Sequence, residues 1–181
     1  MLLEGYKINV GMCLQDPVKI RVVGELTDDI GDVLPYLNAT LKGGMYNHDA
    51  KNLSLKKDGR VITFHPKEIH ITMLENKKKA KEILEWLKDV INKTYDNRQN
   101  IKPKLDSWPI LSAMSLSGYL PNVKCEGCPA NNCYAFARKL IDSEVNIEQC
   151  KPLFSNEYRE KREKLLSLLE RAGYNIPGES W

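Results

Sequence analysis

The stretch Asn52–Leu87, NLSLKKDGRVITFHPKEIHITMLENKKKAKEILEWL, decides the fold of the first half of the chain. Its opening residues alternate between polar and apolar side chains, which is typical of a half-buried strand. Asp58-Gly59 follows and is a β-hairpin signal, because type I′ turns need positive φ at both central residues. We therefore expect residues 61–64 to form the return strand of this hairpin. Residues 69–73, which follow a proline, predict the next strand.

A long helix follows these strands. Asn76 is a typical N-cap, because its side chain can accept a hydrogen bond from a free backbone N–H of the first turn. Apolar residues then recur at intervals of three and four, which predicts one buried stripe. The residues of this stripe are Ala80, Ile83, Leu84, Leu87, Val90 and Ile91. A run of lysines lies largely around the other side of the same helix.

Upstream of these elements, residues 19–23 have strand character. Thr27-Asp28-Asp29 supplies capping chemistry for a short helix that runs through Val33 and Leu41 and ends at a pair of glycines. The order strand, helix, three strands and helix predicts an α+β fold, with an antiparallel sheet that carries its helices on one face.

The segment that begins MYNHDAKNLSLKKDGRVITF resembles one half-repeat of the TATA-box-binding-protein fold. The tyrosine-asparagine before the strand, the glycine hairpin, the following strand and the lysine-rich helix come in the same order. The resemblance covers roughly residues 18–95 and implies a fold. It does not imply DNA binding, because function has to be argued from a site.

Four of the five cysteines lie close together, in the pattern Cys125-x2-Cys128-x4-Cys133-x16-Cys150. A [4Fe–4S] cluster needs four converging thiolates, and a tight C-x2-C loop, a third cysteine one turn on and a distant fourth can supply them. Structural zinc more often uses repeated C-x2-C pairs, and this chain has one such pair. The spacing therefore favours a [4Fe–4S] cluster, with zinc and disulfides as the alternatives.

The sequence predicts two domains, at residues 1–100 and 101–181, joined by the polar stretch 97–108. In the second domain, Cys133 begins a predicted helix that places an apolar wall beside the cluster. The chain from Ser155 predicts a last amphipathic helix, which Gly173 ends and Pro177 prevents from continuing. We expect this cluster domain to be small and mostly helical.

The stretch GYLPNVKCEGCPANNCYAFARKLIDSEVNIEQC closely resembles the [4Fe–4S] domain of the large subunit of corrinoid iron–sulfur proteins. Leu120-Pro121, the four cysteines, Phe136-Ala137 and Leu140 match the pattern of that family. Pro129 and Ser143 stand where the family usually has glycine, and neither change removes a ligand. The corrinoid-binding TIM barrel of that family is absent, so the resemblance implies a cluster module attached to a different α+β domain.

Composition narrows the function classes further. Of the 181 residues, 42% are apolar and 28% are charged, and the formal net charge is only +3, so nucleic acid is an unlikely partner. There is no apolar run of ~20 residues and no signal-peptide pattern, so we expect a cytoplasmic protein without an integral membrane segment. The sequence contains no P-loop, no G-x-G-x-x-G and no Ser-His-Asp signature. We therefore expect a protein that is not a stand-alone enzyme.

Cys13, His48, His65 and His70 are interpreted as structural or surface residues, because none has ligand spacing. The resemblance implies a redox accessory or electron-transfer protein of an anaerobe that docks on a corrinoid protein or a corrinoid-dependent methyltransferase subunit. Two alternatives stay open: a redox- or oxygen-responsive regulatory subunit of a methyltransferase complex, and a nucleic-acid-binding module built on the first domain.

Overall fold

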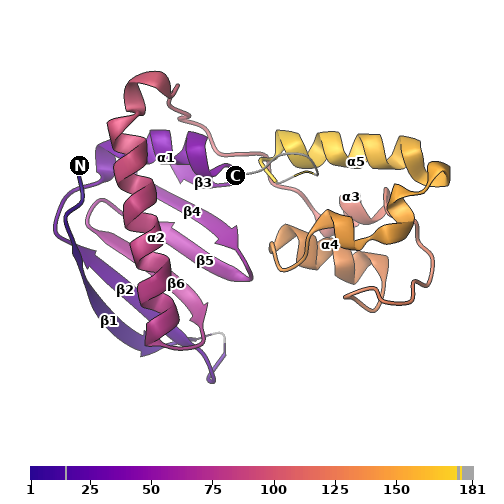
Figure 1. Ribbon diagram of the computed structural model, residues 1–181, viewed down its shortest axis with the longest axis horizontal. Helices are drawn as coiled ribbons and strands as arrows, with labels where there is room; N and C mark the ends of the chain where they lie inside the picture. Colours follow the sequence, from indigo (N-terminus) through magenta and orange to yellow (C-terminus); the bar gives the residue numbers. More distant parts are fainter. Residues whose placement is uncertain (15, 175, 177–181) are drawn as a thin grey trace. The chain divides into compact units, whose positions relative to one another are not determined.

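The computed structural model describes residues 1–14, 16–174 and 176. The chain divides into two compact units (Figure 1). The first contains Met1–Lys56 and Arg60–Ser107. The second contains Lys57–Gly59 and the chain from Trp108 onward. In the part of the chain that is described, no helix is long and apolar enough to cross a membrane.

The first unit is built on an antiparallel sheet of six strands, as the sequence predicts for the fold class. In spatial order the strands are β1, β2, β6, β5, β4 and β3, so β1 and β3 form the two edges. Their bounds are β1 Tyr6–Met12, β2 Ile20–Leu26, β3 Met45–Asn47, β4 Asn52–Lys57, β5 Arg60–Phe64 and β6 Glu68–Leu74.

The hairpin between β4 and β5 forms where the sequence predicts it. Asp58 and Gly59 have φ values of 51° and 72°, as a type I′ turn requires. Along β4 and β5 the residues alternate between buried and partly exposed, so that Leu53, Leu55 and Ile62 lie on the core side. This alternation puts one face of the sheet into the core.

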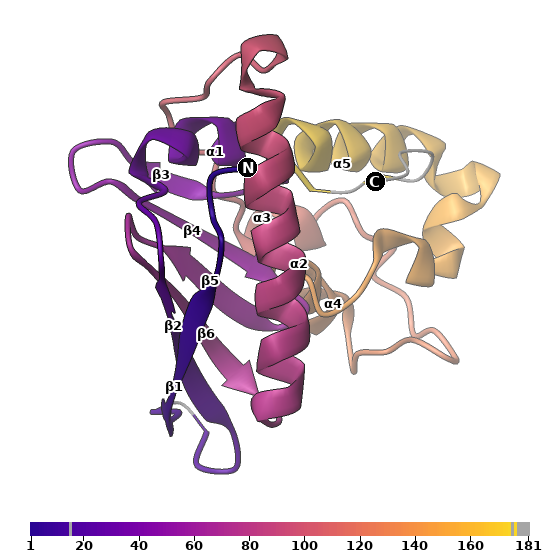
Figure 2. The same cartoon turned by 60° about the vertical axis from the view of Figure 1, so that its left-hand side comes forward.

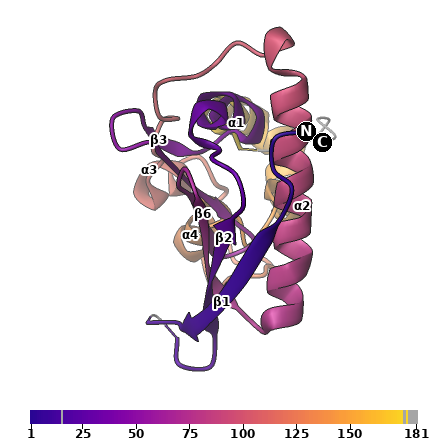
Figure 3. The same ribbon diagram turned by 90° about the vertical axis from the view of Figure 1, so that its left-hand side faces the viewer.

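Helices cover that face of the sheet (Figures 2 and 3). A short 3-10 turn, η1 Gly31–Val33, leads into α1 Leu34–Leu41, and α2 Lys77–Asp96 follows β6 and ends in η2 Arg98–Asn100. Asn76 caps α2 as predicted, because its side chain accepts a hydrogen bond from the Lys79 N–H. The predicted stripe of α2 is confirmed, and Ala80, Leu84, Leu87 and Ile91 are its buried residues.

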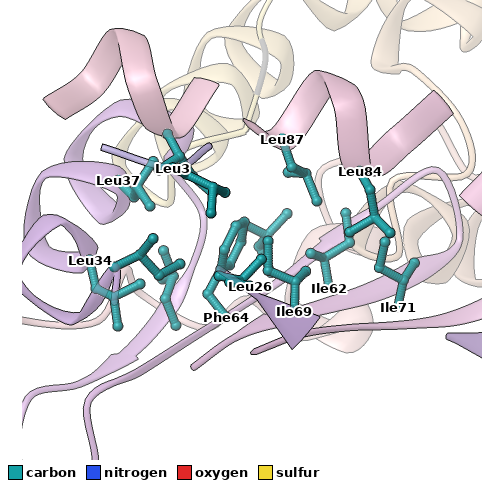
Figure 4. Close-up of a cluster of buried hydrophobic side chains, with 14 of the residues drawn as sticks. Leu3, Leu26, Leu34, Leu37, Ile62, Phe64, Ile69, Ile71, Leu84 and Leu87 are labelled. Carbon is teal, nitrogen blue, oxygen red and sulfur yellow. The ribbon is translucent and has the colours of Figure 1, made fainter. Parts of the chain in front are cut away.

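The core of the first unit lies between the sheet and these helices (Figure 4). Leu34 and Leu37 come from α1, Leu84 and Leu87 from α2, and Phe64 from the sheet, and all are almost fully buried. Gly24 lets α2 approach β2 closely, because a Cβ at this position would lie 2.9 Å from Leu84 Cδ2. The close packing fixes the height of α2 above the sheet.

The sequence interpretation missed two strands and misplaced a helix start. β1 and β3 are edge strands that the sequence interpretation did not include. The helix expected after Thr27 begins at Leu34 and has no side-chain cap. Thr27 Oγ1 instead accepts the Gly5 N–H at 3.0 Å, and Asp28 Oδ2 accepts the Glu4 N–H at 3.0 Å. Thr27 and Asp28 thus fasten the N-terminal segment, whereas Asp29 Oδ1 accepts the Gly31 N–H at 2.8 Å at the start of η1.

The polar segment after α2 is bonded to the first unit up to Ser107. Lys104 N–H donates to Pro35 O at 3.0 Å, and the Asn38 side-chain amide donates to Lys104 O at 2.9 Å and to Asp106 O at 3.0 Å. The Ser107 hydroxyl accepts the Tyr46 N–H and donates to Tyr46 O. The segment is therefore held in place by the Pro35 carbonyl and the Asn38 side chain of α1 and by the backbone of Tyr46 in β3.

The second unit consists of short helices around a separate core. Its helices are α3 Ala113–Ser117, α4 Cys133–Ile141, η3 Ile147–Gln149, η4 Lys151–Phe154, η5 Asn156–Tyr158 and α5 Arg159–Arg171. As predicted, Cys133 is the first residue of α4, and Gly173 follows the end of α5 with a φ of 79°. Pro177 lies outside the described residues. A mostly helical second part is thus confirmed.

Candidate iron–sulfur site

Three local structures of the second unit carry the four cysteines of the predicted site. Cys125 and Cys128 lie in the loop before α4, Cys133 is the first residue of α4, and Cys150 joins η3 to η4. All four lie in the described part of the chain, and none of them forms a disulfide. The disulfide alternative is therefore absent from this structure.

Three features shape the loop between Cys125 and Cys133: the conformation of one glycine and two hydrogen bonds. Gly127 has a φ of 78°, which favours glycine, although a Cβ there would meet nothing within 4 Å. Asn132 caps α4 by accepting the Ala135 N–H at 2.8 Å. The Lys139 ammonium donates to Pro129 O at 3.0 Å. Helix α4 thus anchors the loop that presents the first two cysteines.

A different set of hydrogen bonds holds Cys150 in place. Side chains cap η3 at its start: Gln149 Oε1 accepts the Asn146 N–H at 2.9 Å, and Asn146 Oδ1 accepts the Glu148 N–H at 3.5 Å. Cys150 N–H donates to Ile147 O at 3.0 Å, and Cys150 O accepts the Leu153 N–H at 3.0 Å. The cysteine is therefore locked between two short 3-10 helices.

The four thiols differ in burial. Cys133 and Cys150 are buried in the core of the second unit, Cys128 packs against that core, and Cys125 is half-buried. Phe136, Ala137 and Leu140 of α4 are buried in the same core, as is Leu153. The predicted apolar wall beside the cysteines therefore exists, with two sulfurs inside it and two nearer the solvent.

The thiols influence each other electrostatically. Burial raises the pKa of Cys150 to about 11; the backbone N–H of Leu153 lowers it, and the nearby thiols of Cys133, Cys125 and Cys128 raise it further. The pKa of Cys125 is also raised, first by desolvation and then by Cys133 and Cys128. Cys133 and Cys150 lie in one small core, Cys128 packs against it, and Cys133 and Cys128 raise the pKa of Cys125, so the four cysteines share one neighbourhood.

The sulfurs share this neighbourhood without converging. Among the described residues, no group of three or more His, Cys, Asp or Glu side chains is drawn together tightly enough to hold a metal ion. The donor set itself fits an iron–sulfur cluster, because this unit supplies four free thiols, the usual ligands of such a cluster. Thiols must lose their protons to bind metal, so cluster binding at these cysteines would release protons.

The structure shows what the two departures from the family pattern do. Pro129 cannot donate a backbone hydrogen bond, and its carbonyl instead accepts the Lys139 ammonium. Ser143 has a φ of 56°, in the left-handed region that favours glycine. Serine therefore takes the conformation for which the family usually has glycine.

The remaining candidate residues lie in the first unit. Cys13 is buried, with its Sγ 3.8 Å from Met73 Sδ. His70 Nε2 lies 2.8 Å from Glu68 Oε2, and the rings of His65 and His70 are 4.9 Å apart. None of these groups joins a metal-binding set among the residues described.

Sequence reasoning missed two neighbours of the cysteines. The Leu153 N–H donates to Cys150 O at 3.0 Å and lowers the pKa of the Cys150 thiol. Tyr158, in η5, has a raised pKa, chiefly from desolvation, then from Glu157 and from the nearby Cys125. No spacing rule points to either residue, because a backbone donor has no sequence signature and Tyr158 lies far from Cys125 along the chain.

The chain matches known proteins over this segment. A protein family described as "Putative Fe-S cluster" matches residues 120–152. The acetyl-CoA decarbonylase/synthase complex subunit gamma of Methanocaldococcus jannaschii is 34% identical over 59 residues, which are 33% of this chain and 12% of that protein. The same subunit of Methanothermobacter thermautotrophicus is 40% identical over 57 residues, or 32% of this chain and 12% of that protein.

An uncharacterized protein of M. jannaschii is 30% identical over 74 residues, which are 38% of this chain and 33% of that protein. The chain thus spans a third or less of each of these relatives. No solved structure matches it, and the resemblance of residues 18–95 to the TATA-box-binding-protein fold is not confirmed. The resemblance of the cysteine segment is supported, and residues 120–152 are a match to an iron–sulfur segment.

Proposed function

We propose that this protein is an iron–sulfur redox accessory protein that holds one [4Fe–4S] cluster through Cys125, Cys128, Cys133 and Cys150. One observation carries the proposal. The segment that matches an iron–sulfur family, residues 120–152, contains all four of these cysteines, and the same four thiols share one neighbourhood at the edge of a small core. Four thiolates are the usual ligand set of such a cluster.

A bound cluster of this type supplies one-electron transfer. The protein residues have three tasks around it. Cys133 and Cys150 hold it against the apolar side chains of α4, which limits water at the site. The Leu153 N–H donates to Cys150 O and lowers the pKa of the Cys150 thiol, which favours the thiolate that binds iron. Cys125 and Cys128 lie nearer the solvent, on the side from which a partner can approach.

We further propose that the partner is a corrinoid protein or a corrinoid-dependent methyltransferase subunit in an anaerobe. The matched gamma subunits are named as parts of an acetyl-CoA decarbonylase/synthase complex, which supports the role of an accessory subunit. Exposed apolar side chains lie within four residues of the cysteines in sequence, at Val123, Tyr134 and Phe154, which are 45%, 47% and 37% exposed. Aromatic and aliphatic side chains of this kind are typical of docking surfaces.

The first test is cluster loading. Protein purified without oxygen should contain about four irons and about four sulfides per chain, and dithionite should produce an S = 1/2 EPR signal. Cys128→Ala should lose the signal and much of the iron. Cys13→Ala is the matched control, because Cys13 is buried in the first unit, and it should keep both. Bound zinc without sulfide, or equal iron in the two variants, would refute the cluster.

The second test is electron transfer to a corrinoid. Protein reduced with dithionite and freed of the excess is mixed with a corrinoid protein reconstituted with cob(II)alamin, and the optical spectrum is followed. Each reduced cluster should give one electron, converting one Co(II) to Co(I). Complex formation that depends on oxygen exposure, without any reduction of cobalt, would instead identify a regulatory subunit. The absence of both binding and reduction would refute the corrinoid partner.

A further inference from the structure

A basic groove lies on the first unit, between the edge strand β1 and the helix α2. It has a volume of about 480 Å³. Residues 5–8 line it from the start of β1, and one flank of α2 lines it from the other side. The lining residues of α2 are Lys77, Lys81, Glu85 and Lys88. Their spacing of four, four and three places them on one stripe of the helix, so the groove follows the helix axis.

The single carboxylate of the groove is already bonded. Glu85 Oε1 accepts the Tyr6 hydroxyl at 2.8 Å, and Glu85 Oε2 lies 3.2 Å from Lys88 Nζ. These contacts hold the pKa of Glu85 below its usual value, first through Tyr6 and then through Lys88. Glu85 therefore stays ionised and neutralises Lys88.

Three lysines of the groove remain without such a partner. Within the part of the chain that the structure describes, Lys7, Lys77 and Lys81 form no ion pair and no side-chain hydrogen bond. Lys77 also lies in the first turn of α2, where the helix dipole adds positive charge. The groove therefore presents a row of positive charge to the solvent.

The strand beside this row has an open edge. β1 ends the sheet and is paired only with β2 (Figure 1). Ile8, Val10 and Met12 alternate along β1 and point to one face, and Val10 and Met12 are 49% and 84% exposed. An edge strand with unpaired backbone groups can accept a further strand from another chain.

We propose that this groove binds an extended acidic segment of a partner protein, which pairs with β1 as a seventh strand. On the face of β1 that carries Ile8, the carboxylates of this strand lie against Lys77 and Lys81 of α2, and on the opposite face its remaining side chains lie beside Lys7. The site is separate from the cysteine segment and does not rest on the cluster. Main-chain hydrogen bonds supply affinity in this mode of binding, and the lysines select acidic sequences.

Two other occupants fit the groove less well. A second copy of this chain would pair β1 with β1, which brings two lysine-lined grooves side by side and opposes like charges. Single-stranded nucleic acid binds on aromatic platforms, and the only aromatic residue that lines this groove is Tyr6, whose hydroxyl is bonded to Glu85. An acidic peptide brings no like charges into the groove and needs no aromatic platform.

The test uses the whole chain and a fluorescein-labelled eight-residue peptide in which Glu alternates with Val and Thr. Binding of the peptide is measured by fluorescence anisotropy at low salt. Lys81→Glu should weaken peptide binding by at least fivefold. Lys78→Glu is the matched control, because it makes the same charge change on the same helix at a residue that does not line the groove, and it should change binding less than twofold. A peptide with N-methylated backbone amides should also bind at least fivefold more weakly.

Hydrogen–deuterium exchange supplies a second measurement. The peptide should slow amide exchange in residues 6–12, because these amides become part of a paired strand. Equal weakening by Lys81→Glu and Lys78→Glu would overturn the proposal, since it would indicate unspecific attraction. The proposal would also be overturned if the peptide did not bind at millimolar concentration, if an octathymidylate bound more tightly and displaced it, or if the groove mediated dimers of this chain.

Discussion

Replacing Ser143 by glycine should stabilise the end of α4, the helix that begins with Cys133. Ser143 follows the end of α4 with a φ of 56°. Its N–H donates to Leu140 O at 3.1 Å, and the Glu144 N–H donates to Lys139 O at 2.9 Å. These two bonds form a Schellman motif, whose left-handed residue is usually glycine. Glycine at position 143 would keep both bonds and remove the steric conflict of the Cβ.

The size of the effect follows from two opposing terms. The left-handed conformation costs a residue with a Cβ roughly 1–2 kcal/mol. Removing the Cβ relieves that cost, but about 0.5–1 kcal/mol of the gain is offset, because glycine loses more conformational freedom on folding. The Ser143 hydroxyl forms no hydrogen bond with any described residue, so nothing else is lost. The net stabilisation is therefore about 0.5–1 kcal/mol, which corresponds to roughly a two- to fivefold change in an equilibrium constant.

The assay is amide hydrogen–deuterium exchange in peptides that cover α4. Ser143→Gly should slow exchange there by that factor, because opening of the helix becomes less favourable. The chain offers a reciprocal control in Gly173, which has a φ of 79° and the same pair of bonds at the end of α5. Gly173→Ser should speed exchange in α5 by a similar factor. Unchanged or faster exchange in α4, with the α5 control behaving as expected, would refute the reasoning.

Three further predictions concern stability and reactivity. Asn132→Ala removes the cap that accepts the Ala135 N–H, so the free energy of unfolding should fall by about 1 kcal/mol in urea; an unchanged midpoint would contradict the cap. Gly24→Ala should destabilise the first unit by about 1–3 kcal/mol, because its Cβ would lie 2.9 Å from Leu84 Cδ2. Combining it with Leu84→Ala should cost less than the sum of the single changes, and strict additivity would show that the two side chains do not collide. In iron-free protein, Cys150 should react with iodoacetamide much more slowly in the folded state than in urea at about pH 8, because its folded pKa is raised to about 11 and the thiolate is the nucleophile. Its rate in the folded state should rise about tenfold per pH unit up to that pKa, and equal rates in the two states would contradict the burial of this thiol.

Much of the sheet and the long helix could be predicted because their signals are local. Asp58-Gly59 specifies a turn through its own backbone preferences, and Asn76 caps α2 with a residue three positions away. The apolar stripe of α2 repeats with the period of the helix itself. Such elements need no knowledge of what they pack against.

The missed elements depend on distant partners. β1 is an edge strand whose residues are mostly partly or fully exposed, so its alternation is weak, and it exists because it pairs with β2. Thr27 and Asp28 have the chemistry of helix caps, but their side chains accept hydrogen bonds from backbone N–H groups of the N-terminal segment instead. In both cases a tertiary contact, rather than local preference, decides the structure.

The sequence by itself determined the ligand set proposed for the cluster. Four cysteines in the pattern x2, x4 and x16 define a candidate site because ligand type and spacing are chemical properties of the chain. Only the tertiary structure decided that Cys133 and Cys150 are buried while Cys125 and Cys128 lie nearer the solvent, and that Cys150 lies between two short 3-10 helices. It also placed the lysines of α2 beside the open edge of β1. Burial and the pairing of distant segments arise from packing, and packing is a property of the whole fold.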